Sequence, residues 1–101
     1  MVGPWITATI ASGATTSDEV DLQDLHERIL VLLPDMTGAT ATVQVSADRS
    51  NWSTLDKPNA GGAMALPKQK ASVVDVGGAQ FVRFVSADTE AAERTISVRG
   101  C

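Results

Sequence analysis

The sequence has little of what catalytic and metal sites are usually built from. Its 101 residues include one histidine, His26, and one cysteine, Cys101, which is the last residue. A catalytic triad needs a nucleophile held against an imidazole, and no Gly-x-Ser-x-Gly motif is present to expose a serine. A zinc site needs four nitrogen or sulfur ligands, which these two residues cannot supply. We therefore expect no enzyme activity, no metal and no cofactor.

Carboxylates are more numerous, and they fall into two clusters. Their members are Asp18, Glu19, Asp21 and Asp24 in the first, and Asp88, Glu90 and Glu93 in the second. Neither cluster has the Asp-x-Asp-x-Asp-Gly spacing of a calcium loop. We interpret both as solvated acidic loops that keep the chain soluble. A single cysteine also excludes an intrachain disulfide, so the fold does not depend on an oxidising compartment.

Aromatic residues and clustered basic residues are scarce as well. Aromatics make up 4% of the chain, tyrosine is absent, and the net charge is −4 with scattered Lys and Arg. Nucleic-acid binding is therefore not expected. The longest apolar run, residues 29–34, is too short to span a membrane. Residues 1–5 lack the pattern of a signal peptide, which predicts synthesis in the cytoplasm without export.

Hydrophobic residues recur with a period of two, which is typical of half-buried strands. Residues 5–10 and 39–46 alternate, and the apolar run 28–33, closed by Pro34, predicts a central strand buried on both faces. The expected strands are residues 5–10, 19–22, 28–33, 39–46, 52–55, 63–66, 72–76, 80–86 and 95–99. The alternative at residues 22–29 is a single helical turn.

About eight to nine short strands separated by turns predict an all-β fold, an antiparallel β-sandwich of jelly-roll or discoidin-like type. Residues 1–12 form an N-terminal strand or arm, and residues 13–101 form the single sandwich domain. Trp5 and Ile6 lie close to a chain end and must be covered, either by the domain's own sheet or by a neighbouring subunit. If they form an arm, deletion of residues 1–10 leaves the core folded.

Trp52 has two interpretations. It follows a turn and begins an expected strand, so its ring is placed to stack on a sugar. It is also a candidate for the main aromatic of the core, and we favour this second interpretation because a domain this poor in aromatics is expected to bury them.

Two stretches resemble a known group of proteins. Residues 43–55, VQVSADRSNWSTL, and residues 78–88, GAQFVRFVSAD, are similar to small bacteriophage virion proteins, with a weaker similarity to discoidin-type modules. Residues 8–22, residues 29–48 and the ending ERTISV at 93–98 also resemble the phage group. The resemblance implies a structural protein of the phage particle, such as a capsid decoration protein, a head fibre or a tail accessory component, and it implies no catalytic residue.

The function that follows from this resemblance is that of a decoration or cement protein located in the virion. Such a protein binds the major capsid protein or other virion proteins and stabilises joints between coat subunits. We expect a homo-oligomer, with a trimer favoured at local three-fold positions. The candidate contact residues are Trp5, Ile6, Lys57, Pro58 and Asn59. The alternative is a carbohydrate-binding or host-adhesion module of a phage tail or fibre, with Trp52 as its glycan contact.

Overall fold

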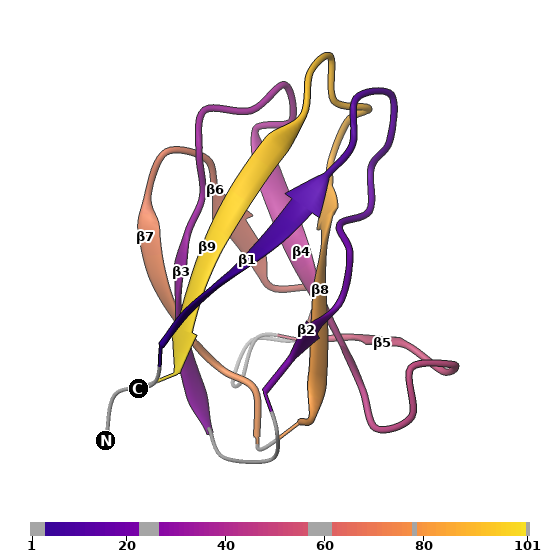
Figure 1. The fold of residues 1–101 in the computed structure, drawn as a ribbon, viewed down its shortest axis with the longest axis vertical. Coiled ribbons are helices and arrows are strands. Elements are labelled where there is room, and N and C mark those ends of the chain that lie inside the picture. Colours follow the sequence, from indigo (N-terminus) through magenta and orange to yellow (C-terminus); the bar gives the residue numbers. More distant parts are fainter. Residues whose placement is uncertain (1–3, 23–26, 57–61, 78, 101) are drawn as a thin grey trace.

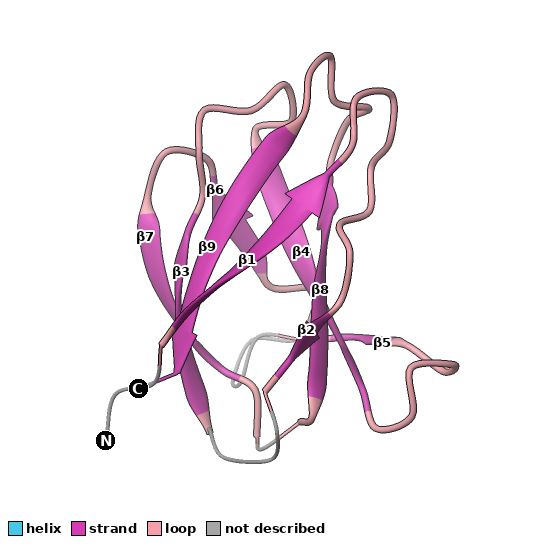
Figure 2. Cartoon of the chain, in the orientation of Figure 1, coloured by secondary structure: helices cyan, strands magenta, loops and turns pink. Residues whose placement is uncertain are grey.

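The computed structural model describes residues 4–22, 27–56, 62–77 and 79–100. They form two antiparallel sheets packed face to face and contain no helix (Figures 1 and 2). The nine strands are β1 (Trp5–Ile10), β2 (Val20–Asp21), β3 (Arg28–Leu32), β4 (Thr40–Ser46), β5 (Ser53–Thr54), β6 (Ala65–Pro67), β7 (Ala71–Asp75), β8 (Phe81–Ser86) and β9 (Arg94–Gly100). The predicted all-β sandwich is confirmed.

Most successive strands belong to different sheets. The first sheet has the order β1-β9-β3-β7, and the second has the order β2-β8-β4-β5, with β6 also paired to β4. The chain crosses from one sheet to the other at every connection except those within β4–β6, which is the double Greek-key wrapping of a jelly roll. The helical turn predicted near residues 22–29 falls largely on residues 23–26, which lie outside the described residues, while Ile29 belongs to β3.

The core is a thin layer of aliphatic side chains between the sheets. Its fully buried members include Ile10, Ile29, Val43 and Ile96, and its central aromatic residue is Phe84, which is 0% exposed. The prediction that Trp52 is the main core aromatic is wrong, because Trp52 is only half-buried. A phenylalanine suits this layer better, since it has no polar atom that needs a hydrogen-bond partner.

The prediction that residues 28–33 form a strand buried on both faces is also wrong. β3 is central in its sheet, between β9 and β7, but its burial alternates. Ile29 and Val31 are fully buried, whereas Leu30 is half-buried and Leu32 is 36% exposed. A continuous apolar run indicates burial on both faces only where both faces are covered, and each sheet of a two-layer sandwich is covered by its partner on one side.

The N-terminal segment is part of the sandwich. β1 pairs with β9 along its whole length, from Trp5 opposite Arg99 to Ile10 opposite Arg94. Ala8 and Ile10 are 0% exposed in the core. Of the two alternatives for covering this segment, the domain's own sheet therefore pairs with residues 5–10 and buries Ala8 and Ile10, while the Trp5 side chain stays 47% exposed. Deletion of residues 1–10 would remove part of the core and would not leave it intact.

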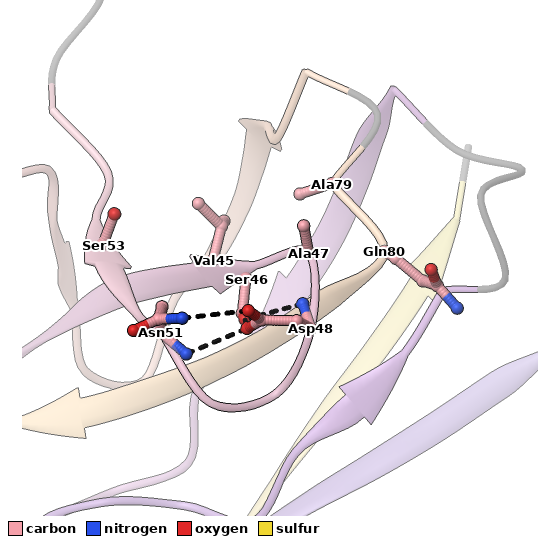
Figure 3. Close-up of a pocket in the computed structure, with 8 residues that line it drawn as sticks. All are labelled: Val45, Ser46, Ala47, Asp48, Asn51, Ser53, Ala79 and Gln80. Carbon is pink, nitrogen blue, oxygen red and sulfur yellow. Dashed lines mark hydrogen bonds between the residues drawn. The ribbon is translucent and has the colours of Figure 1, made fainter.

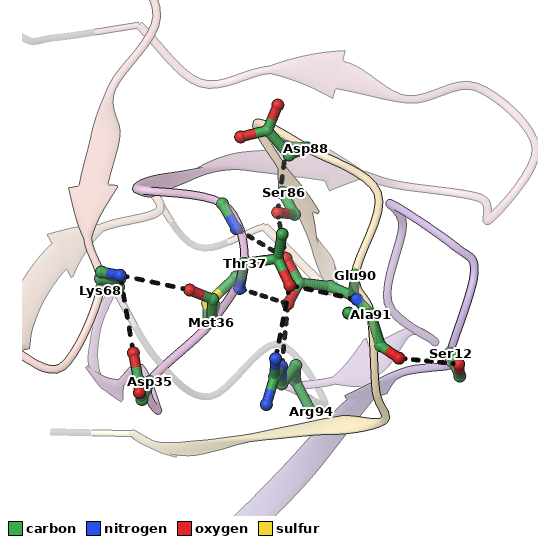
Figure 4. Close-up of polar contacts among 11 residues, drawn as sticks. Ser12, Asp35, Met36, Thr37, Lys68, Ser86, Asp88, Glu90, Ala91 and Arg94 are labelled. Atoms are coloured by element: carbon green, nitrogen blue, oxygen red, sulfur yellow. Dashed lines mark hydrogen bonds and ion pairs between the residues drawn. The ribbon is translucent and has the colours of Figure 1, made fainter.

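A buried carboxylate ties together the loops at one end of the sandwich (Figure 4). Glu90, interpreted from the sequence as solvated, is 1% exposed, so that interpretation is wrong. Its Oε1 accepts hydrogen bonds from Thr37 N at 2.8 Å and Arg94 Nε at 2.9 Å. Its Oε2 accepts from Gly38 N at 3.0 Å and Ser86 Oγ at 2.7 Å. Four donors thus compensate one buried negative charge.

These hydrogen bonds also decide the protonation state of Glu90. Burial by itself raises the pKa of this carboxyl group, but the donors on Ser86, Gly38, Thr37 and Arg94 outweigh it and lower the pKa to about 2. Glu90 is therefore ionised at neutral pH. The site leaves no room for a side chain at Gly38, because a Cβ there would collide with Ser86 Oγ.

Candidate interaction surface

The outer face of the first sheet carries a band of apolar side chains. The strand register places four residues in one row across the sheet: Trp5, Arg99, Leu30 and Val73. The next row consists of Thr7, Ser97, Leu32 and Ala71. Among the described residues, the exposed large apolar side chains are Trp5 at 47%, Leu32 at 36% and Val73 at 61%, and all three lie on this face. The face is therefore apolar in a chain with 20% charged residues.

The charged residues of this face are Arg99, within the row of Trp5, Leu30 and Val73, and the pair Arg28 and Asp75 in the row beyond it. Arg99 places its guanidinium carbon 5.3 Å from the centre of the Trp5 ring, a cation–π contact. Arg28 and Asp75 lie opposite each other on β3 and β7. The cores of protein interfaces are depleted in charged residues and enriched in Trp and Arg, and this face has that composition.

The residues predicted to contact a partner do not lie on one surface. Trp5 lies on the outer face and is exposed, whereas Ile6 points between the sheets and packs against the core. Lys57, Pro58 and Asn59 lie outside the described residues. The sequence interpretation missed Leu30, Leu32 and Val73 as surface residues. For Leu30 and Leu32 the signal was the continuous apolar run 29–33, because a strand covered on one side needs an apolar residue only at every second position.

The outer face of the second sheet is polar and holds two stacked pairs. Arg83 lies 4.3 Å above the Trp52 ring, and its Nε donates to Gln44 Oε1 at 2.7 Å. Arg49 lies 4.4 Å above the Phe81 ring. The indole Nε1 of Trp52 donates to the Arg49 carbonyl at 3.1 Å. Stacking of a sugar needs an open ring face, and Arg83 occupies one face of this ring.

A shallow depression of about 460 Å³ lies between the β4–β5 turn and the chain that enters β8 (Figure 3). The residues that line it are Val45, Ser46, Ala47, Asp48, Asn51, Ser53, Ala79 and Gln80. Backbone hydrogen bonds from Asn51 and Ser50, and then the Asn51 side chain, hold the pKa of Asp48 well below its usual range. Because this carboxylate already fixes its own turn, it is not available as an acid or base.

Other kinds of site have no support in the described part of the chain. It contains no group of three or more His, Cys, Asp or Glu residues that is arranged to hold a metal ion. The same residues include no helix long and apolar enough to cross a membrane. His26 and Cys101 lie outside the described residues.

Comparison with known proteins adds information on the fold. No protein-family model and no curated protein matches this sequence. Among solved structures, the chain is similar to the crystal structure of SPBc2 prophage-derived protein YomS. The two share 11% sequence identity with a TM-score of 0.66, over 99% of this chain and 94% of the other. At this identity the match shows that the two proteins share a fold along their whole length.

Proposed function

We propose that this chain is a structural protein of a bacteriophage particle, a decoration or cement protein that binds the outer capsid surface and stabilises joints between coat subunits. Two independent lines support a phage origin. Residues 43–55 and 78–88 resemble small virion proteins of phages, and the matched structure, YomS, is described as prophage-derived.

The observation that carries the proposal is the apolar outer face of the first sheet. Docking against a coat subunit would remove Trp5, Leu32 and Val73 from water, and the small side chains of Thr7, Ser97 and Ala71 beside them would allow close approach. Stable interfaces bury ~800 Å² per partner, a substantial part of a domain of this size. Modest contacts repeated over a closed shell become strong through avidity.

The carbohydrate-binding alternative has less support. It rests on Trp52, and one face of that ring is occupied by Arg83 while its indole N–H is bonded to the Arg49 carbonyl. Both contacts give Trp52 a role in holding the β4–β5 turn against the sheet.

Mass spectrometry of purified particles of the encoding phage tests the proposal. We expect the chain in the particles at a copy number comparable to that of the major coat protein, because decoration proteins occupy repeated positions on the shell. A copy number typical of a tail component would contradict the capsid assignment. Absence from the particles would contradict a virion role altogether.

A further inference from the structure

One edge of the first sheet is left open, at β7. The hydrogen bonds from Val76 N to Glu27 O at 2.8 Å and from Leu33 N to Lys70 O at 3.2 Å fix which β7 residues bond to β3. Bonded and non-bonded pairs alternate along an antiparallel ladder, so Ser72 and Val74 bond to β3. The N–H and C=O groups of Ala71, Val73 and Asp75 therefore point away from the sheet.

The opposite edge of the same sheet is covered at Thr9, one of its outward-facing residues. At β1, the Thr9 backbone N–H donates to Asp18 Oδ1 at 2.6 Å, and Asp18 N donates to the Thr9 carbonyl at 3.1 Å. No backbone hydrogen bond from any described residue reaches the outward groups of Ala71 or Val73. β7 also lacks a proline or a bulge, and its middle residue, Val73, is 61% exposed. Proteins normally protect such edges, because an open edge accepts another strand.

We infer that β7 pairs with β7 of a second copy of this chain, antiparallel and about a two-fold axis at Val73. The first sheets of the two copies would then become one continuous sheet. Val73 would lie opposite Val73 of the second copy, and Ala71 would lie opposite Asp75. The outward N–H and C=O groups of the two edges would satisfy each other.

Charge favours a second copy as the occupant of this edge. β7 is preceded by Lys70 and ends at Asp75. Antiparallel pairing about Val73 places Lys70 of one copy opposite Val76 of the other, one position from Asp75, so each end of the joined strands carries one positive and one negative charge. The pairing also joins the apolar bands of the two copies, since Leu30 lies beside Val73 in the sheet. A two-fold pair differs from the trimer that the sequence resemblance favours.

Sedimentation of the full chain tests this pairing independently of any phage particle. Wild type is expected at twice its 10.5 kDa mass. Val73→Lys and Val73→Glu, changed at an exposed position, are each expected to sediment at half the wild-type mass, because a residue on the two-fold axis faces its own copy and like charges repel. An equimolar mixture of the two variants should restore the dimer, since Lys then faces Glu.

Thr95→Lys is the matched control, because it adds the same charge to the same outer face, on β9 and away from the β7 edge. It should remain dimeric. A monomeric or trimeric wild type would overturn the inference, and a monomer would leave the edge open to an extended segment of another protein. Dimeric Val73→Lys, or a mixture that stays monomeric, would also overturn it. Thermal unfolding of each variant shows whether the fold is intact.

Discussion

Replacement of Glu90 by glutamine is expected to lower the free energy of unfolding by about 3 kcal/mol. Each carboxylate oxygen accepts two hydrogen bonds, one pair from Thr37 N and Arg94 Nε and the other from Gly38 N and Ser86 Oγ. Glutamine must place an NH₂ group at one of these positions, where it would face two donors. Buried donors then lose their acceptor, and the Arg94 guanidinium loses its counter-charge.

The measurement is urea unfolding at neutral pH, with Glu93→Gln as the control. Glu93 is exposed and undergoes the same chemical change three residues away, so its effect should stay within about 0.5 kcal/mol. Equal stability of Glu90→Gln and Glu93→Gln would show that the carboxylate does not hold the β3–β4 and β8–β9 loops together.

The same carboxylate predicts a pH dependence. The pKa of Glu90 is lowered from an ordinary value of 4.5 to about 2 in the folded chain. Above pH 4.5 the group is ionised in both states, and its stabilisation is fully present. As the pH falls from 4.5 towards 2, the unfolded chain binds the proton first, so this stabilisation is lost. The stability difference between wild type and Glu90→Gln should therefore shrink over this interval and stay constant above it.

Replacement of Phe84 by alanine is expected to cost about 4 kcal/mol, whereas Trp52→Ala should cost about 1 kcal/mol. Phe84 is fully buried, so its removal leaves a cavity between the sheets. Trp52 loses one cation–π contact and one hydrogen bond in a half-exposed position. Because a loss of 4 kcal/mol can unfold a domain of this size, Phe84→Leu provides a milder test of the same site.

Urea unfolding of the three variants decides between the two aromatics. The expected order of destabilisation is Phe84→Ala, then Phe84→Leu, then Trp52→Ala. A Trp52→Ala variant as unstable as Phe84→Ala would support the sequence interpretation of Trp52 as the main core aromatic.

Strand positions followed from the sequence because the period of two is a local property. All nine expected strands overlap observed ones, and β1 has the predicted bounds. The same alternation also predicts that one phenylalanine of β8 lies in the core. Phe81 and Phe84 are three positions apart in β8, so they face opposite sides, and one of them must point into the sandwich.

What the sequence could not predict depends on contacts between distant residues. Glu90 belongs to an acidic cluster that is typical of a solvent-exposed loop. Its hydrogen-bond donor Gly38 is 52 positions away in the sequence. The apolar run 29–33 indicated that these side chains are buried. It did not indicate whether the residues that bury them belong to this chain or to a partner. The sandwich covers Ile29 and Val31, and leaves Leu30 and Leu32 to the outer face. Trp5 was predicted as a contact residue because it lies near a chain end, and the sheet places it on that same face.

The most direct test of docking through this face is rebinding to phage particles that lack the chain. Purified wild type should bind such particles saturably. The double variant Trp5→Ala/Leu32→Ser should bind at least about tenfold more weakly, because removal of interface anchors typically costs more than 1 kcal/mol each. Trp52→Ala, on the other sheet, should bind as wild type does. Wild-type binding by the double variant, or loss of binding by Trp52→Ala, would contradict docking through the outer face of the first sheet.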